Sequence, residues 1–290
     1  MMFKYLISVL LVLLFSYFVS AQQNPQIPGI NQKNEATKIE KYVDLFDYRT
    51  IKDSVSENGF VLERRFKTLP ATGDKPESAV LKKNSKTVFQ FDRIVHPFSS
   101  VFFGAFPFLG KAGGSQLFIA QIAPRSGNHW VINVKPAYEV LFSSDEYNVG
   151  REEFHAIDLD GDRIYELSFE SLAFYNFEPQ RLGNAGVPLT EIVFKYDAGS
   201  RKYVPANPQF ANYALRGVDD EIVRIRGDNK DFQLAGVLSI VLQYVYSGRE
   251  ADAWALFDQN YQFADREEIK IKAQAVLKND AVYQYIYKQN

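Results

Sequence analysis

The residues best suited to chemistry in this chain are four carboxylates that lie within one short segment. Asp158, Asp160 and Asp162 alternate along the chain, and Glu166 follows four residues after Asp162. Carboxylates this close repel one another unless a cation compensates their charge. Calcium takes about six to eight oxygen ligands, and a tight loop of alternating carboxylates supplies them. The segment therefore predicts a calcium site formed by these four side chains and a backbone carbonyl near Ile164.

The spacing of these carboxylates is not that of an EF-hand, which needs a Glu at position twelve of its loop. Counted from Asp158, position twelve is Phe169. The segment Asp158–Leu167 instead resembles the calcium loops of FG-GAP and VCBS-type repeats, known from integrin-like β-propellers. The resemblance implies that the loop joins two strands of a propeller blade and that the four carboxylates bind one calcium ion. Arg163 departs from the family pattern, which usually has Gly there, and a positive φ angle at this position would strain it.

The same acidic segment can also be an ordinary hairpin turn, because Asp and Gly are common turn residues. The apolar segments on either side, Phe154–Ile157 and Ile164–Phe169, place it between two strands under either interpretation. If calcium binds, we expect it to fix the loop and not to catalyse a reaction.

Other residue types that support catalysis give weaker patterns. The chain has 3 His and 0 Cys, which excludes cysteine catalysis and disulfides. His96, His129 and His155 are not spaced as metal ligands. Ser115 follows two glycines, but the G-x-S-x-G nucleophile motif is absent, so a turn before a strand is favoured. The aromatic run at 102–108 suits either a sheet core or a binding surface for sugars or peptides.

Short apolar segments separated by turn residues predict an antiparallel β-meander over the middle of the chain. We expect residues 71–78 to be a polar loop and residues 39–53 to be either a short helix or a strand. The expected strands lie in a hairpin over 79–91 and then at 101–109, 117–122, 130–134, 138–142, 153–157, 164–169, 191–196 and 202–204. We expect this body to resemble propeller blades or a sandwich and to occupy residues 39–208.

Apolar residues at helical spacing predict a helical segment over residues 209–290. The first clear helix covers Leu234 to Val245 and ends near Gly248, and a second covers Ala251 to about Tyr261. Asp265 with Glu268 three residues later predicts a capping box at the start of a third helix. The predicted fold class is therefore α+β, with a small helical segment after the meander.

The N-terminus predicts export from the cytoplasm. Lys4 is the only charge before an apolar run from Tyr5 to Val19, and Val19 and Ala21 suit the −3 and −1 positions of signal peptidase. We expect cleavage after Ala21 and a flexible polar leader over 22–38. An uncleaved anchor is the alternative, but the run is shorter than the roughly 20 residues of a membrane span. The predicted location is secreted or periplasmic, with no stable membrane span after cleavage.

Composition limits the class of partner. The formal net charge is −2, and removal of the signal takes away one Lys and no acid, which argues against a nucleic-acid partner. The absence of Cys suits a bacterial exported protein better than a eukaryotic one. The segment order over about residues 79–287 also resembles a group of uncharacterised exported bacterial proteins with a single Asp-x-Asp-Gly-Asp loop. That resemblance implies no particular activity.

Two hypotheses for function follow. The first is a non-enzymatic binding or structural module outside the cytoplasm, with one calcium-stabilised hairpin loop and an extracytoplasmic ligand or protein as partner. The second is an extracellular hydrolase acting on polysaccharide or peptide through carboxylates that spacing does not identify. A pocket with two carboxylates about 5–10 Å apart would favour the hydrolase.

Overall fold

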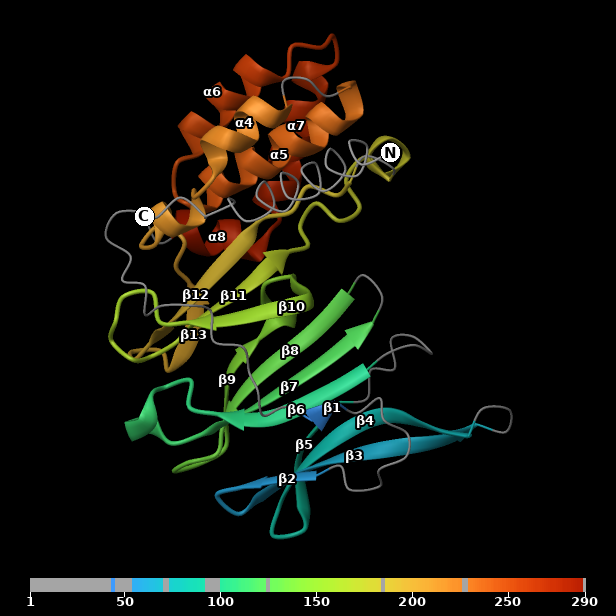
Figure 1. The fold of residues 1–290 in the computed structure, drawn as a ribbon, viewed down its shortest axis with the longest axis vertical. Coiled ribbons are helices and arrows are strands. Elements are labelled where there is room, and N and C mark those ends of the chain that lie inside the picture. Colours follow the sequence, from blue (N-terminus) through green and yellow to red (C-terminus); the bar gives the residue numbers. More distant parts are fainter. Residues whose placement is uncertain are drawn as a thin grey trace, which may run out of the picture. The chain divides into compact units, whose positions relative to one another are not determined.

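Short runs bounded by turn residues form the β part of the chain, and apolar residues at helical spacing form its C-terminal part. The computed structural model describes residues 43–44, 54–69, 73–91, 100–123, 126–183, 186–225 and 229–288 (Figure 1). The predicted signal peptide and leader, residues 1–38, lie outside these residues. Most of the undecided segment 39–53 does too.

The strands of the described residues form three antiparallel sheets. The first, in strand order, consists of β2 Ser54–Glu57, β3 Phe60–Leu69, β4 Gly73–Lys83 and β5 Lys86–Phe91. The second consists of β1 Val43–Asp44, β6 Ser100–Phe106, β7 Gln116–Ala123, β8 Ser126–Asn133 and β9 Glu139–Ser143. The third consists of β10 Val149–Ile157, β11 Glu166–Ser171, β12 Glu191–Asp197 and β13 Lys202–Pro205.

Apart from β1, which pairs with β6, consecutive strands pair within each sheet, so the predicted meander is confirmed. In the described part of residues 79–204, helix is limited to short turns at η1 Lys111–Gly113, η2 Ser144–Glu146 and α2 Pro179–Leu182. The predicted loop at 71–78 is wrong in extent, because β4 begins at Gly73 and pairs with β3. Pro76 lies beside a register shift in that pair, where a residue without an N–H is tolerated. Strands β2 and β3 were not predicted.

The C-terminal part is helical, as predicted, and the α+β class is confirmed. Its helices are α3 Ala211–Ala214, α4 Val218–Ile225, α5 Lys230–Tyr246, α6 Glu250–Asn260, α7 Arg266–Lys278 and α8 Ala281–Lys288. Asn229 caps α5 by accepting the backbone N–H groups of Asp231 and Phe232. Gly248 follows α5 with a φ of 79°, a left-handed conformation that suits glycine. Among the described residues, no helix has both the length and the apolar character of a membrane span.

The predicted capping box at Asp265 is wrong. Asp265 precedes α7, but its side chain makes no capping hydrogen bond. Its carboxylate instead accepts Arg181 Nη1 at 2.9 Å and Tyr261 Oη at 3.2 Å, and it pairs with Lys230 Nζ at 3.0 Å. Two cations and a phenol bind a carboxylate more strongly than one backbone N–H does, so long-range contacts override the local motif.

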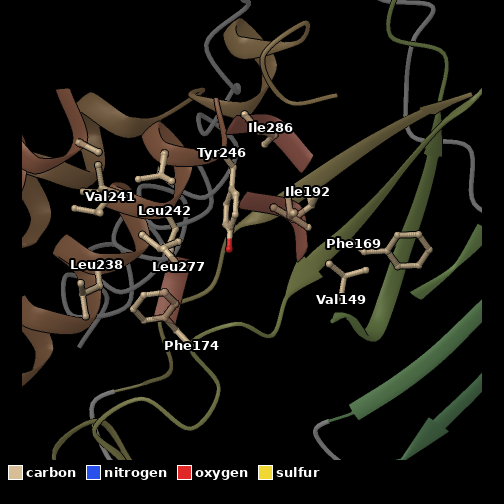
Figure 2. Packing of buried hydrophobic residues seen from close by; sticks show 14 of the residues in the cluster. Val149, Phe169, Phe174, Ile192, Leu238, Val241, Leu242, Tyr246, Leu277 and Ile286 are labelled. Carbon is tan, nitrogen blue, oxygen red and sulfur yellow. The ribbon is translucent and has the colours of Figure 1, made fainter. Parts of the chain in front are cut away.

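One large apolar cluster joins the third sheet to the helices. Figure 2 shows its side chains, including Phe169 and Ile192 from the sheet and Leu238 and Tyr246 from α5. The Tyr246 hydroxyl lies 3.4 Å from Ser171 Oγ on β11 and donates to Asp280 Oδ2 at 3.1 Å. The helices therefore pack on the sheet through apolar contact and through a buried polar link. A second, smaller cluster joins strands β3 and β4 to β7 and β8.

Candidate metal centre

The acidic loop lies between strands β10 and β11, as predicted. Ile157 and Glu166 are cross-strand partners at the end of this hairpin, so the loop covers residues 158–165. It is also attached to the segment after β6, because the backbone N–H of Tyr165 donates to the carbonyl of Phe108 at 2.8 Å. The hydroxyl of Tyr203 on β13 donates to the carbonyl of Tyr165 at 3.1 Å. Two neighbouring elements therefore fix one end of the loop.

The three aspartates bind the backbone of their own loop. Asp158 Oδ1 accepts the N–H of Gly161 at 2.8 Å, Asp160 Oδ1 accepts the N–H of Asp162 at 3.2 Å, and Asp162 Oδ1 accepts the N–H of Ile164 at 2.7 Å. Each bond uses one carboxylate oxygen. The second oxygens can face a cation, and that of Asp160 accepts the ammonium of Lys195.

The loop has two residues with positive φ. Gly161 has a φ of 81° and Arg163 has a φ of 71°. The strain expected at Arg163 is therefore present, and for a non-glycine residue it costs about 1–2 kcal/mol. Gly110, in a separate segment, leaves room for this conformation of Arg163. A Cβ at Gly110 would lie 2.7 Å from the carbonyl oxygen of Arg163.

Gly110→Ala is expected to displace the acidic loop and to destabilise the protein by about 2 kcal/mol more than Gly114→Ala does. Both glycines have a φ of 73°, but a Cβ at Gly114 meets nothing within 4 Å. The difference between the two variants therefore cancels the cost of backbone strain, which both share, and leaves the cost of the contact with Arg163. Urea unfolding of the two variants measures the difference, and equal losses would show that the contact does not constrain the loop.

Glu166 is the buried member of the cluster, with an exposed fraction of 1%. Its Oε2 accepts the backbone N–H of Leu159 at 2.8 Å, while Oε1 has no hydrogen-bond partner among the described residues. Burial, together with the charges of Asp160 and Asp162, raises the pKa of Glu166 to about 7 against the opposing effects of the Leu159 N–H and the Lys195 ammonium. A buried carboxylate with one unsatisfied oxygen is costly, and a cation beside that oxygen would compensate it.

Lys195, on strand β12, supplies a cation that the sequence analysis missed. Its ammonium donates to Asp160 Oδ2 and lies 3.7 Å from Asp162 Oδ2 and 3.7 Å from Glu166 Oε1. The strand register explains its place, because Leu167 pairs with Phe194 and Lys195 follows next to Glu166. Sequence spacing contains no signal for this contact, since it depends on the pairing of β11 with β12.

The structure brings the predicted ligands together in part. Carboxylate oxygens of Asp158, Asp160 and Glu166 lie within 4.8 Å of one another, a group that can hold a metal ion. Asp162 and Ile164 are not part of this group. Asp162 lies near the Lys195 ammonium that also contacts the group, and Ile164 donates its backbone N–H to Asp162. All of the donors are oxygens, which suits a hard cation, and the unpartnered Oε1 of Glu166 belongs to the same group.

The other residues considered for chemistry have different roles. Phe106 and Phe108 pack in the large apolar cluster, so the described aromatics of that run belong to the core. His129 is buried with an exposed fraction of 1%, and His155 lies on β10 three residues before the loop. Neither belongs to the metal-binding group, and His96 lies outside the described residues.

Comparisons of the chain with protein-family models, with curated proteins and with solved structures found no match.

Proposed function

We propose that this protein is an exported, non-enzymatic binding or structural module in which one calcium ion stabilises the β10–β11 hairpin. The observation that carries the proposal is the buried Glu166 Oε1, which has no hydrogen-bond partner among the described residues and lies in one group with Asp158 and Asp160. The export of the protein rests on the predicted signal peptide with cleavage after Ala21.

Calcium fits this loop better than other common cations do. Transition metals favour imidazole or thiolate ligands, whereas this group contains carboxylates alone. Magnesium demands near-ideal octahedral geometry, whereas calcium accepts irregular arrangements of six to eight oxygens. The second oxygens of the aspartates and a carbonyl near Ile164, together with water, can complete such a shell. Calcium is also abundant outside the cytoplasm, where the predicted signal sends the chain.

A bracing role follows from where the ligands lie. They hold the turn of a hairpin whose two strands continue into the large apolar cluster through Ala156, Leu167 and Phe169. A cation at the turn links the first strand to the second and takes the place of the Lys195 ammonium beside Asp160 and Glu166. We therefore infer that the ion stabilises the third sheet and that the resemblance to FG-GAP and VCBS-type loops extends to this role.

A thermal melt with calcium and with a chelator tests the proposal. We expect calcium to raise the melting temperature of the wild-type protein, as any ligand of the native state does. Asp160→Ala should abolish the rise. Asp197→Ala is the matched control, because Asp197 also accepts backbone N–H groups in an exposed turn but lies outside the metal group. No rise at millimolar calcium in the wild-type protein would refute the proposal.

One observation bears on the alternative hydrolase. Glu170 and Glu191 are cross-strand partners and both line a cavity on the third sheet. Burial alone would raise the pKa of Glu191, but the charge of Arg216 and hydrogen bonds from Ser168, Arg216 and Tyr213 hold it below its usual value. An ionised carboxylate with three hydrogen bonds is poorly suited to donate a proton. Release of nitrophenol from nitrophenyl glycosides, lost in Glu170→Gln, would favour the hydrolase.

A further inference from the structure

We propose that the cavity on the third sheet binds an uncharged, hydroxyl-rich small molecule of the size of a mono- or disaccharide. This inference deepens the proposed binding function by naming a ligand class, and it rests on that function. The cavity has a volume of about 390 Å³, near the lower end of the roughly 300–1,000 Å³ typical of small-molecule sites. The volume suits one compact ligand and not a long polymer segment.

The cavity lies on one face of the sheet and is closed by residues from the helical part. His155 on β10 is the cross-strand partner of Ser168 on β11, and Glu170 on β11 is the partner of Glu191 on β12. Residues two apart on a strand, such as Ser168 and Glu170, share a face of the sheet, and their cross-strand partners share it with them. These four side chains therefore lie together. Arg216 and Gln243, from the segment after α3 and from α5, complete the polar lining.

Part of the lining is rigid before any ligand binds. Glu191 Oε1 accepts the hydroxyls of Ser168 and of Tyr213, the latter at 3.0 Å, and Oε2 accepts Arg216 Nη2 at 2.5 Å. Arg216 also donates to the carbonyl of Tyr213 at 2.7 Å and lies over its ring at 3.7 Å. A prearranged wall reduces the ordering cost of binding.

Other lining groups remain available to a ligand. His155, Thr190 and Gln243 line the cavity, and their side chains have no hydrogen-bond partner within the described ranges. An imidazole donates hydrogen bonds, and a hydroxyl and an amide both donate and accept them. A hydroxyl of a ligand also does both, so it matches every one of these groups.

Charge separates this ligand class from others. The positive charge of Arg216 is paired with Glu191, so it offers little to an anion. Glu191 already accepts three hydrogen bonds and offers little to an ammonium group. The groups that remain fit a neutral ligand with several hydroxyls.

The three histidines of the chain permit a direct test by NMR. Ring signals of histidine-labelled protein are recorded with neutral mono- and disaccharides, and with glucosamine, glucuronic acid and glucose 6-phosphate as charged counterparts. His155→Gln identifies the signal of His155. We expect at least one neutral sugar to shift the His155 signal saturably while the buried His129 signal stays in place. Gln243→Met, which keeps the side-chain size, should weaken binding about tenfold, and the exposed Gln259→Met should not.

The inference is overturned if no neutral sugar shifts the His155 signal at tens of millimolar. It is equally overturned if only charged ligands do so, or if Gln243→Met binds as tightly as the wild-type protein. A calcium melt on the same samples separates the two proposals. A calcium-dependent melting temperature without sugar binding refutes only the ligand class, and sugar binding without a calcium effect refutes only the metal brace.

Discussion

Acidification from pH 7 to pH 3 is expected to cost the wild-type protein about 4 kcal/mol of stability through His129. Burial lowers the pKa of this ring from 6.5 to about 3. The unfolded chain therefore binds a proton between these values while the folded protein does not. The contribution of His129 to stability is fully present above pH 6.5, falls as the pH decreases and reaches its lower limit near pH 3.

The surroundings of His129 explain the size of this effect. The ring lies among Phe118, Phe154 and Phe169, with centroid distances of 6.1, 6.1 and 5.0 Å. Its Nδ1 has no hydrogen-bond partner among the described residues. A Cβ at Gly150 would lie 2.9 Å from Nδ1, so the backbone closes the remaining side. Burial therefore disfavours the protonated ring, and no charged group among the described residues offsets this effect.

His129→Gln should flatten the dependence of stability on pH over this window, because glutamine does not titrate. Urea unfolding at several pH values between 3 and 7 gives the slope for each protein. His155→Gln is the matched control, since His155 is only partly buried and lies on the adjacent sheet. A His129→Gln variant that keeps the wild-type slope would show that other groups cause the loss in acid.

The second large effect concerns Lys195. In the absence of calcium, Lys195→Met should destabilise the protein by about 2 kcal/mol, because Glu166 loses the nearest opposite charge to its buried Oε1. Calcium should restore the stability and should bind about tenfold more tightly to the variant, since it no longer competes with the ammonium. Urea unfolding in chelator and in calcium, with a calcium titration, measures both changes.

Lys202→Met is the control for this prediction. Lys202 lies on the neighbouring strand β13, and no ion pair joins it to another described residue. Its replacement should leave both the metal-free stability and the calcium affinity within error of the wild-type values. An unchanged stability of Lys195→Met in chelator, with weaker calcium binding, would show that Lys195 assists the ion and does not compete with it.

The hairpin and its loop could be predicted because their signals are local. The apolar residues beside the loop alternate with polar ones, and aspartates and a glycine mark the turn between them. The helix over Lys230–Tyr246 could be predicted equally well, because its buried residues recur at helical spacing and Gly248 follows its end. In each case neighbours in sequence are also neighbours in space.

Other features depend on contacts between distant residues, so spacing could not predict them. Lys195 reaches the acidic loop through the register of β11 with β12, and Gly110 touches Arg163 from a separate segment. Asp265 stands where a helix-capping residue is expected, but its carboxylate binds Arg181 and Lys230 and not the backbone of the helix. The cavity residues likewise come from three strands and the helical part.

A calorimetric titration of the chelator-treated protein with calcium, near neutral pH, tests the metal centre most directly. We expect saturable binding of one ion per chain in the wild-type protein and in Asp197→Asn. Glu166→Gln should remove the binding, because it replaces the buried carboxylate of the metal-binding group with a neutral amide of the same shape. Absence of binding to the wild-type protein, or equal binding to Glu166→Gln, would contradict the proposal that this loop is a calcium site.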